Sequence, residues 1–131
     1  MMTDHDLRIR LAEAQGWTDI MVPGPRPRMG EDVTGMPPEG HRPGYCTELP
    51  DPLEDDSDAA LLRAWCVEQP WCGGLVVAID RRTVEVTISD ADGEPFDDTP
   101  HTVTRKGEPD PCRRERLALC RAVLQAIEAQ P

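Results

Sequence analysis

Apolar and polar residues alternate most strictly in "TVEVTISD", residues 83–90, where Val84, Val86 and Ile88 share one parity. A period of two places these side chains on one face, so the segment predicts a half-buried strand. The preceding "CGGLVVAID", residues 72–80, has a wider apolar run, which is typical of a strand that lies centrally in a sheet. Because only the short "DRR" separates the two segments, they are expected to form an antiparallel hairpin.

A third, weaker strand is predicted at "HTVTRK", residues 101–106, after a turn at "DADGEP". Residues 90–95 begin like an oxygen-rich calcium loop, but the later ligands and the terminal Glu of an EF-hand loop are missing. A hairpin turn is the favoured interpretation, and the three strands together predict a small antiparallel sheet.

Helical spacing of apolar residues predicts an N-terminal helix over residues 4–15. Thr3 can cap this helix together with Asp6, a variant of the capping box. Gly16 followed by Trp17 suits a helix end of the Schellman type.

A second helix is predicted in "LEDDSDAALLRAWCVEQP", residues 53–70. Ser57 or Asp56 is expected to be its N-cap, and Pro70 is expected to end it. The residues expected to share one face of this helix are Leu61, Leu62, Trp65 and Cys66.

The closing segment "PCRRERLALCRAVLQAIEAQP" predicts the longest helix, with Asp110 as N-cap and Pro111 as its first residue. Its main apolar stripe consists of Leu117, Cys120, Val123, Leu124 and Ile127. Its polar wedge consists of Arg114, Arg121, Gln125 and Glu128. A separate stripe of small residues consists of Ala118, Ala122 and Ala126. Such a stripe lets another helix approach closely, so it predicts either a helix of the same chain or a homo-oligomer contact there.

Residues from about 22 to 52 are crowded with Pro and Gly, which argues against a long helix or a central strand. Within them, only "GYCTEL" predicts a short edge strand. We therefore expect a single domain over residues 1–131 that carries this excursion. The fold class predicted is α+β, a small antiparallel sheet of about three strands covered by helices, like an α/β/α sandwich.

Acidic residues outnumber basic ones by 25 to 14, which gives a net charge of −11. General nucleic-acid binding and docking on an anionic membrane both rely on cations, so neither is expected. No segment approaches the ~20 apolar residues of a membrane span, and the N-terminal residues lack the apolar region of a secretory signal. Five irregularly spaced cysteines do not indicate a disulfide framework. A cytoplasmic location is expected.

The cysteine spacings are too wide for the close pairs of a structural zinc site, so we expect packing roles, no metal and no cofactor. None of the three histidines has a neighbouring nucleophile, and no phosphate-binding loop or dinucleotide fingerprint occurs. The sequence therefore favours a protein that binds over one that catalyses.

Two pairs of arginines are candidate contacts for an anion. Arg113 and Arg116 lie in the first turns of the closing helix, and Arg81 and Arg82 lie in the hairpin turn. For the first pair, the favoured alternative is pairing with carboxylates, for which Glu108, Asp110, Asp55 and Asp56 are candidates.

The order of "AEAQGW", "LPDPLEDDSDAALLRAW", a hairpin and "RLALCRAVLQAIE" resembles the phage ABA sandwich domain family. The resemblance implies an α/β/α arrangement with helical cover on both faces of the sheet, and a phage or prophage origin. It implies no catalytic residues. An acidic insertion after Tyr45 departs from the family pattern, in which a Tyr-Ser-Thr-like element leads directly into the second helix.

The expected function is that of a small accessory protein in the cytoplasm of the phage host, which binds a host or phage protein. The alternative is a sponge that sequesters a small nucleotide immune signal, with its phosphates on the arginines named above. A small enzyme that attacks such a signal is the third hypothesis.

Overall fold

The computed structural model describes residues 3–23, 32–38, 47–96 and 101–130. The chain divides into two compact units, residues 1–50 and 51–131, and each is described by itself. A compact unit need not fold on its own, so the single domain expected from the sequence stays a prediction.

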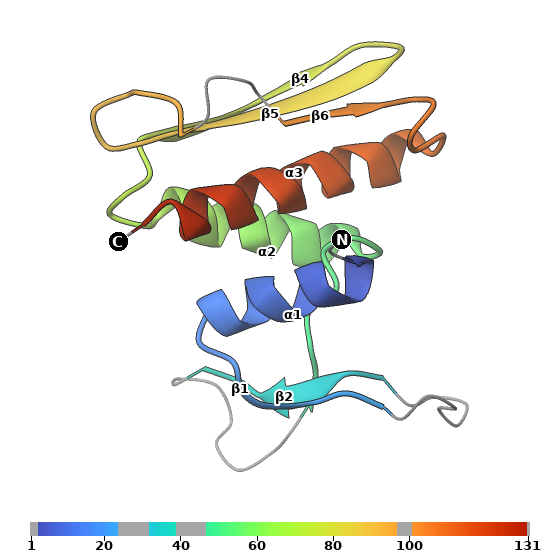
Figure 1. Cartoon of the computed structure of the whole chain (residues 1–131), viewed down its shortest axis with the longest axis vertical. Coiled ribbons are helices and arrows are strands. Elements are labelled where there is room, and N and C mark those ends of the chain that lie inside the picture. The colour runs from blue at the N-terminus through green and yellow to red at the C-terminus, as the bar shows by residue number, and fades with distance from the viewer. Residues whose placement is uncertain (1–2, 24–31, 39–46, 97–100, 131) are drawn as a thin grey trace. The chain divides into compact units, whose positions relative to one another are not determined.

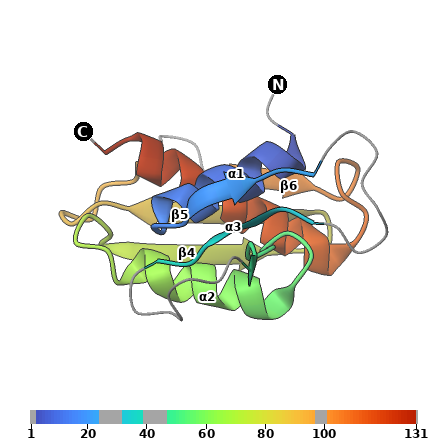
Figure 2. The same ribbon diagram turned by 90° about the horizontal axis from the view of Figure 1, so that it is seen from below.

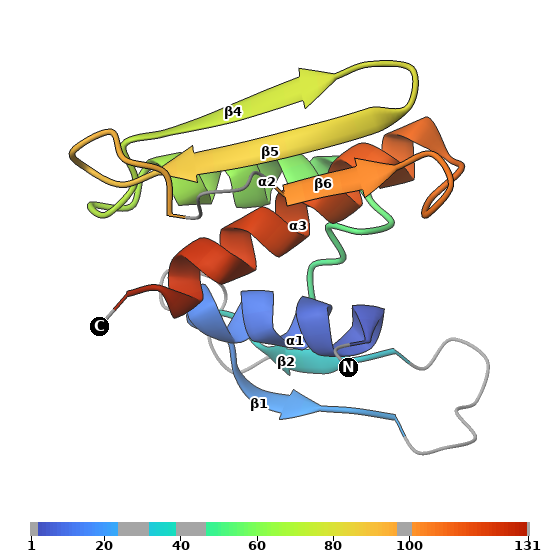
Figure 3. The same cartoon turned by 45° about the horizontal axis from the view of Figure 1, so that its top comes forward.

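The second unit contains a three-stranded antiparallel sheet with the strand order β4-β5-β6. Its strands are β4 (Gly74–Ile79), β5 (Thr83–Ser89) and β6 (His101–Thr104). Val84, Val86 and Ile88 on β5 are all buried, as their alternation predicted. The helix α3 (Pro111–Glu128) packs against β5 and β6 (Figures 1 and 3).

The predicted position of the apolar strand was wrong, because β4 lies at an edge of the sheet and β5 lies in its middle. The tight turn at Arg81 and Arg82 joins β4 to β5, and β6 then pairs with the other side of β5. A run of apolar residues predicts that the side chains of a strand are buried. It does not show whether the strand has a hydrogen-bonded neighbour on both sides.

The helices of this unit confirm the α+β class, since a small antiparallel sheet is covered by helices. The helix α2 (Asp56–Val67) runs beside α3 and packs against it (Figures 1 and 2). Both helices lie on the same face of the sheet, and no helix among described residues 51–131 covers the other face (Figure 3). The family resemblance implied helices on both faces of the sheet, whereas the described helices of this unit cover only one face.

Three details of α2 correct the sequence analysis. Its N-cap is Asp55, whose side chain accepts from the backbone N–H of Asp58, and the helix ends at Val67, ahead of the proline. Leu61 is 67% exposed rather than part of the buried face. The buried positions of α2 are Ala59, Leu62 and Cys66, at spacings of three and four residues.

The closing helix begins as expected, because Asp110 accepts from the backbone N–H of Cys112 and Pro111 is the first helical residue. Leu124, predicted to be in the core, is buried. The small-residue stripe of Ala118, Ala122 and Ala126 is also buried, so it does not present the open surface that a homo-oligomer contact would need.

The turn after β5 is held by Asp90, whose side chain accepts from the backbone N–H groups of Asp92 and Glu94. Gly93 adopts a positive φ of 89° there. Beyond the turn, Phe96 makes an edge contact with Trp71 at 5.8 Å between ring centroids. These bonds are those of a turn, as the sequence analysis favoured.

The first unit begins with α1 (Asp4–Ala14), which Thr3 and Asp6 cap with the predicted reciprocal hydrogen bonds. Gly16 has a φ of 100°, and the backbone N–H of Trp17 donates to Ala12 at 3.1 Å. This six-to-one bond is the predicted Schellman end.

A second three-stranded antiparallel sheet completes this unit, in the order β1-β2-β3. Its strands are β1 (Thr18–Met21), β2 (Thr34–Met36) and β3 (Thr47–Glu48). The strand β1 was not predicted, and the expectation that residues 22–52 hold no central strand was wrong, because β2 lies between β1 and β3. The edge strand expected in "GYCTEL" is present as β3, while residues 44–46 lie outside the described residues.

Glycine makes the central strand β2 possible rather than preventing it. A Cβ atom at Gly35 would meet the Leu49 side chain at 3.1 Å and the Ile20 side chain at 3.2 Å. The three residues of β2 therefore fit between their neighbours because Gly35 has no side chain. Val33 and Leu49 beside this sheet form a buried cluster with Ala12 of α1.

Arg8 links the segments of the first unit. Its buried guanidinium donates to both carboxylate oxygens of Asp32, at 2.8 and 3.1 Å, and to the carbonyl oxygens of Leu49 and Pro50. The hydrogen bonds from Arg8 are the main cause that lowers the pKa of Asp32. A buried arginine is stable here because its donors have acceptors.

Candidate anion-binding site

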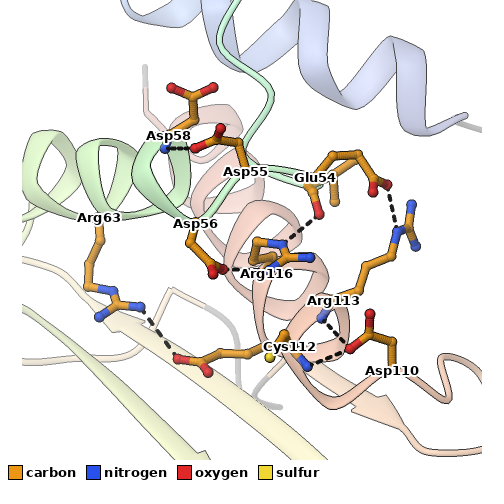
Figure 4. A network of polar contacts seen from close by, with 11 residues as sticks. Glu54, Asp55, Asp56, Asp58, Arg63, Asp110, Cys112, Arg113 and Arg116 are labelled. Carbon is orange, nitrogen blue, oxygen red and sulfur yellow. Dashed lines mark hydrogen bonds and ion pairs between the residues drawn. The ribbon is translucent and has the colours of Figure 1, made fainter.

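The first predicted pair of arginines, at the start of α3, is bound to carboxylates of the same unit (Figure 4). Nε of Arg113 donates to Oε1 of Glu54 at 2.7 Å, and its guanidinium also lies 3.5 Å from Glu108. Arg116 donates to the carbonyl oxygen of Leu53 at 2.7 Å and pairs with Asp56 at 2.5 Å. The pairing alternative is confirmed for Glu108 and Asp56, and Glu54 is a partner that the sequence analysis did not name.

These contacts have a structural role, because they join the start of α3 to the segment that precedes α2. The side chains of Arg113 and Arg116 are only 21% and 12% exposed. A bound anion would have to compete with carboxylates that already occupy both guanidinium groups. As a site for an external anion, this pair is therefore unfavourable.

Arg114 was wrongly placed on the polar wedge of α3, since it is only 4% exposed. Its guanidinium donates to the carbonyl oxygens of Glu108 at 2.9 Å and Pro109 at 3.0 Å, just before the helix. An arginine can be buried when its donors are satisfied by backbone acceptors nearby. Arg121 is exposed, as predicted.

The second predicted pair lies at the hairpin end of the β4-β5-β6 sheet, where an open pocket of about 630 Å³ is found. Its lining residues are Arg82, Thr83, Thr104, Arg105 and Lys106. Thr83 and Thr104 face each other across β5 and β6, and Arg105 donates its backbone N–H to the carbonyl oxygen of Arg82 at 2.6 Å. The strand register therefore brings the beginning of β5 and the end of β6 together.

Two tight turns hold the pocket residues in place. Oδ1 of Asp80 accepts from the backbone N–H groups of Arg82 and Thr83, both at 2.7 Å, and its Oδ2 accepts from the Thr83 hydroxyl at 3.1 Å. The bonds from these backbone N–H groups lower the pKa of Asp80 below its usual value. In the other turn, the Thr104 hydroxyl oxygen accepts from the backbone N–H of Gly107 at 3.1 Å.

The pocket concentrates positive charge in an acidic chain. Three of its five lining residues are cations, and Lys106 is the only lysine in the sequence. Arg82, Arg105 and Lys106 are all exposed, and none of them makes an ion pair within the described part of the chain. Two carboxylates lie two residues from a pocket cation along the chain. Asp80 accepts hydrogen bonds within the turn, and Glu108 lies 3.5 Å from the guanidinium of Arg113.

Of the four arginines predicted as anion contacts, the structure thus places Arg82 in the pocket. Arg81 lies in the same turn and is exposed, but it is not among the lining residues. Arg105 and Lys106 were missed as site residues. The signal for them was available, because in a three-stranded meander the end of the third strand lies beside the start of the second.

Chemically, the pocket offers donors for negatively charged oxygen atoms. Two guanidinium groups can each form paired hydrogen bonds with a phosphate or carboxylate, and the ammonium group of Lys106 adds a compact charge. Guanidinium and ammonium groups carry hydrogen-bond donors and no acceptor. The arrangement is therefore suited to recognition of an anion.

Elsewhere, no three or more His, Cys, Asp or Glu side chains of the described residues are grouped so that they could hold a metal ion. The four described cysteines form no disulfide with one another, and Cys46 lies outside the described residues. Burial and the neighbouring Cys72 raise the pKa of the Cys66 thiol to about 12, so Cys66 is neutral at physiological pH.

No helix in the described ranges is both long enough and apolar enough to cross a membrane.

Comparisons with models of protein families, with curated proteins and with solved structures found no match to this chain. The resemblance to the phage ABA sandwich family therefore stays a prediction. The chemistry of the pocket is therefore the feature that bears on function.

Proposed function

We propose that this protein acts by binding a small anionic ligand, of the phosphate-bearing class, in the pocket at the hairpin end of the β4-β5-β6 sheet. The observation that supports it is the convergence of Arg82, Arg105 and Lys106 on one pocket. No ion pair among the described residues occupies these three cations, in contrast to Arg113 and Arg116 at the start of α3.

A small ligand suits the site better than a polymer. The volume of about 630 Å³ lies within the ~300–1,000 Å³ that ligand pockets occupy. A nucleic acid extends over many phosphates and would meet the net charge of −11 beyond the pocket. A ligand with one or two phosphates can be neutralised by the pocket alone.

This proposal favours the sponge hypothesis among the functions expected from the sequence. A sponge needs a binding site and no catalytic group, and the donors of the pocket match the phosphates of a nucleotide signal. We propose further that the protein works in the cytoplasm of the phage host, where such signals are made. Binding to a host or phage protein remains the alternative when no nucleotide is retained.

The test uses the full chain, because the pocket residues belong to a unit not shown to fold alone. Inorganic phosphate, pyrophosphate, mononucleotides and cyclic dinucleotides are titrated by calorimetry, and bound material is released by heat and analysed. Retention of an intact nucleotide supports the sponge, and a chemically altered product indicates an enzyme. Failure of every anion to bind would contradict the proposal.

Matched variants assign the binding to the pocket. Arg105→Ala and Lys106→Ala should each weaken the affinity about tenfold, as expected for loss of one charged hydrogen-bonding group. Arg121→Ala removes an equal charge from the exposed side of α3 and should leave the affinity unchanged. Equal losses of affinity in all three variants would mean that only the overall charge of the protein matters. That result would contradict a specific binding site at the pocket.

A further inference from the structure

The strand β4 has the composition of a central strand and the position of an edge strand. Its six residues, "GLVVAI", include no charge and no proline, and its register with β5 is continuous without a bulge. Proteins commonly protect an exposed edge with charges, prolines or bulges. Among the described residues, no strand pairs with the outer side of β4.

The hydrogen bonds of the hairpin show which backbone groups point outward. The backbone N–H of Asp80 donates to the carbonyl oxygen of Thr83 at 3.0 Å. Hydrogen-bonded and non-hydrogen-bonded residue pairs alternate along an antiparallel ladder. This bond therefore determines which residues of β4 direct their backbone N–H and C=O groups toward β5 and which direct them away from it. The inward-pointing groups belong to Val76 and Ala78. The outward-pointing groups belong to Leu75, Val77 and Ile79.

From this geometry we propose that β4 pairs antiparallel with β4 of a second copy, about a two-fold axis at Val77. In that register Leu75 lies opposite Ile79 of the second copy, and the two Val77 residues face each other. All three outward-pointing residues then meet residues whose groups also point outward, as a ladder requires. The result is a continuous six-stranded sheet with a symmetric interface.

The side chains fit this arrangement as well as the backbone does. Val76 and Ile79 are 64% and 61% exposed in one copy. Pairing places Val76 opposite Ala78 of the second copy on one face, and Ile79 opposite Leu75 on the other. Each apolar residue of β4 thereby meets an apolar partner, and no charge enters the strand pairing.

A second copy explains this edge better than an acidic or basic peptide, because a neutral apolar strand offers nothing for charged side chains. The contact covers few residues, so its area falls below the ~1,600 Å² of a standard interface and a micromolar dimer is expected. The net charge of −11 on each copy opposes association, and salt screens that repulsion. The dimer should therefore strengthen as the salt concentration rises.

Amide hydrogen exchange, followed by NMR at two protein concentrations, tests the pairing residue by residue. The amides of Leu75, Val77 and Ile79 should exchange slowly at high concentration and at least tenfold faster on dilution. The amides of Val76 and Ala78 bond to β5 within the chain and should stay protected at both concentrations. Outward amides that exchange at the same rate at both concentrations would overturn the proposal.

Analytical ultracentrifugation with two matched variants tests the interface. Ile79→Lys should raise the dimer dissociation constant at least tenfold, because it places a charge opposite an apolar residue. Leu61→Lys changes the charge equally at a similarly exposed position on α2 and should leave the dimer intact. A monomer at millimolar concentration in high salt, or a dimer unaffected by Ile79→Lys, would refute pairing through β4.

Discussion

The start of α3 and the hairpin end of the sheet both carry arginines, yet the fold uses them in opposite ways. Arg113 and Arg116 are mostly covered and bound to Glu54, Glu108 and Asp56. Arg82 and Arg105 are exposed, with no ion pair among the described residues. The comparison shows that residue type and a position near a turn or helix start do not decide whether a cation can bind a ligand. The carboxylates that the fold brings nearby decide it.

The largest effect is expected from reversing one charge in the pocket. Arg105→Glu should lower the affinity for pyrophosphate or a nucleotide about 100-fold, because an attraction of about 1–3 kcal/mol becomes a repulsion. Isothermal titration calorimetry measures the change. Arg121→Glu makes the same change in net charge on α3, and an equal loss in that variant would remove the distinction between the two regions.

A smaller effect, on stability, is expected from the paired arginines. Arg116→Ala leaves the carbonyl oxygen of Leu53 without its side-chain donor and should lower the free energy of unfolding by about 1–3 kcal/mol. Arg82→Ala should change it by less than about 0.5 kcal/mol, because that side chain is exposed. Urea unfolding of both variants measures the two losses in free energy of unfolding. Equal losses would contradict the expected difference between the paired and the exposed arginine.

The smallest effect concerns Asp80, the carboxylate beside the pocket. Its pKa is lowered chiefly by the backbone N–H groups of Arg82 and Thr83, so its folded value lies below the ordinary 3.8. A depressed folded pKa stabilises the fold above the unfolded value, and this stabilisation disappears as the pH falls through the lower folded value.

The stability difference between the protein and Asp80→Asn should therefore be constant from about pH 5 to 7 and shrink below the ordinary value of 3.8. Thermal melts over that range measure it. Anion affinity at neutral pH should rise less than about threefold in this variant, since the carboxylate serves the turn. A large rise would show that Asp80 pairs with the pocket cations.

Local features of the fold were predictable from the sequence because few neighbouring residues determine them. The capping residues Thr3 and Asp6 act within one helical turn, and Gly16 needs only its own left-handed backbone. The alternation of β5 likewise identified its buried face. By contrast, β1 and β2 are too short for any period to stand out, and β2 depends on space left by Gly35.

One of the three cations of the candidate site followed from the sequence, and two did not. Arg82 was predicted because a hairpin turn exposes its side chains, whereas Arg105 and Lys106 join it only through the register of β5 with β6. Arg114 was misplaced because a helical wheel does not show the carbonyl groups that receive its guanidinium. The edge position of β4 was missed because strand order is a property of the whole sheet.

The tight turn between β4 and β5 also bears on how the chain reaches its native state. Residues that contact through a short loop meet at little entropic cost, and a hairpin of this kind forms in about 1–10 μs. The β4–β5 hairpin can therefore form before β6 and α3, which come later in the chain, have joined the sheet. Its neutral outer edge is then exposed while the chain is still incomplete. We expect refolding yield to fall with protein concentration, and Ile79→Lys to restore it by keeping unfinished chains apart.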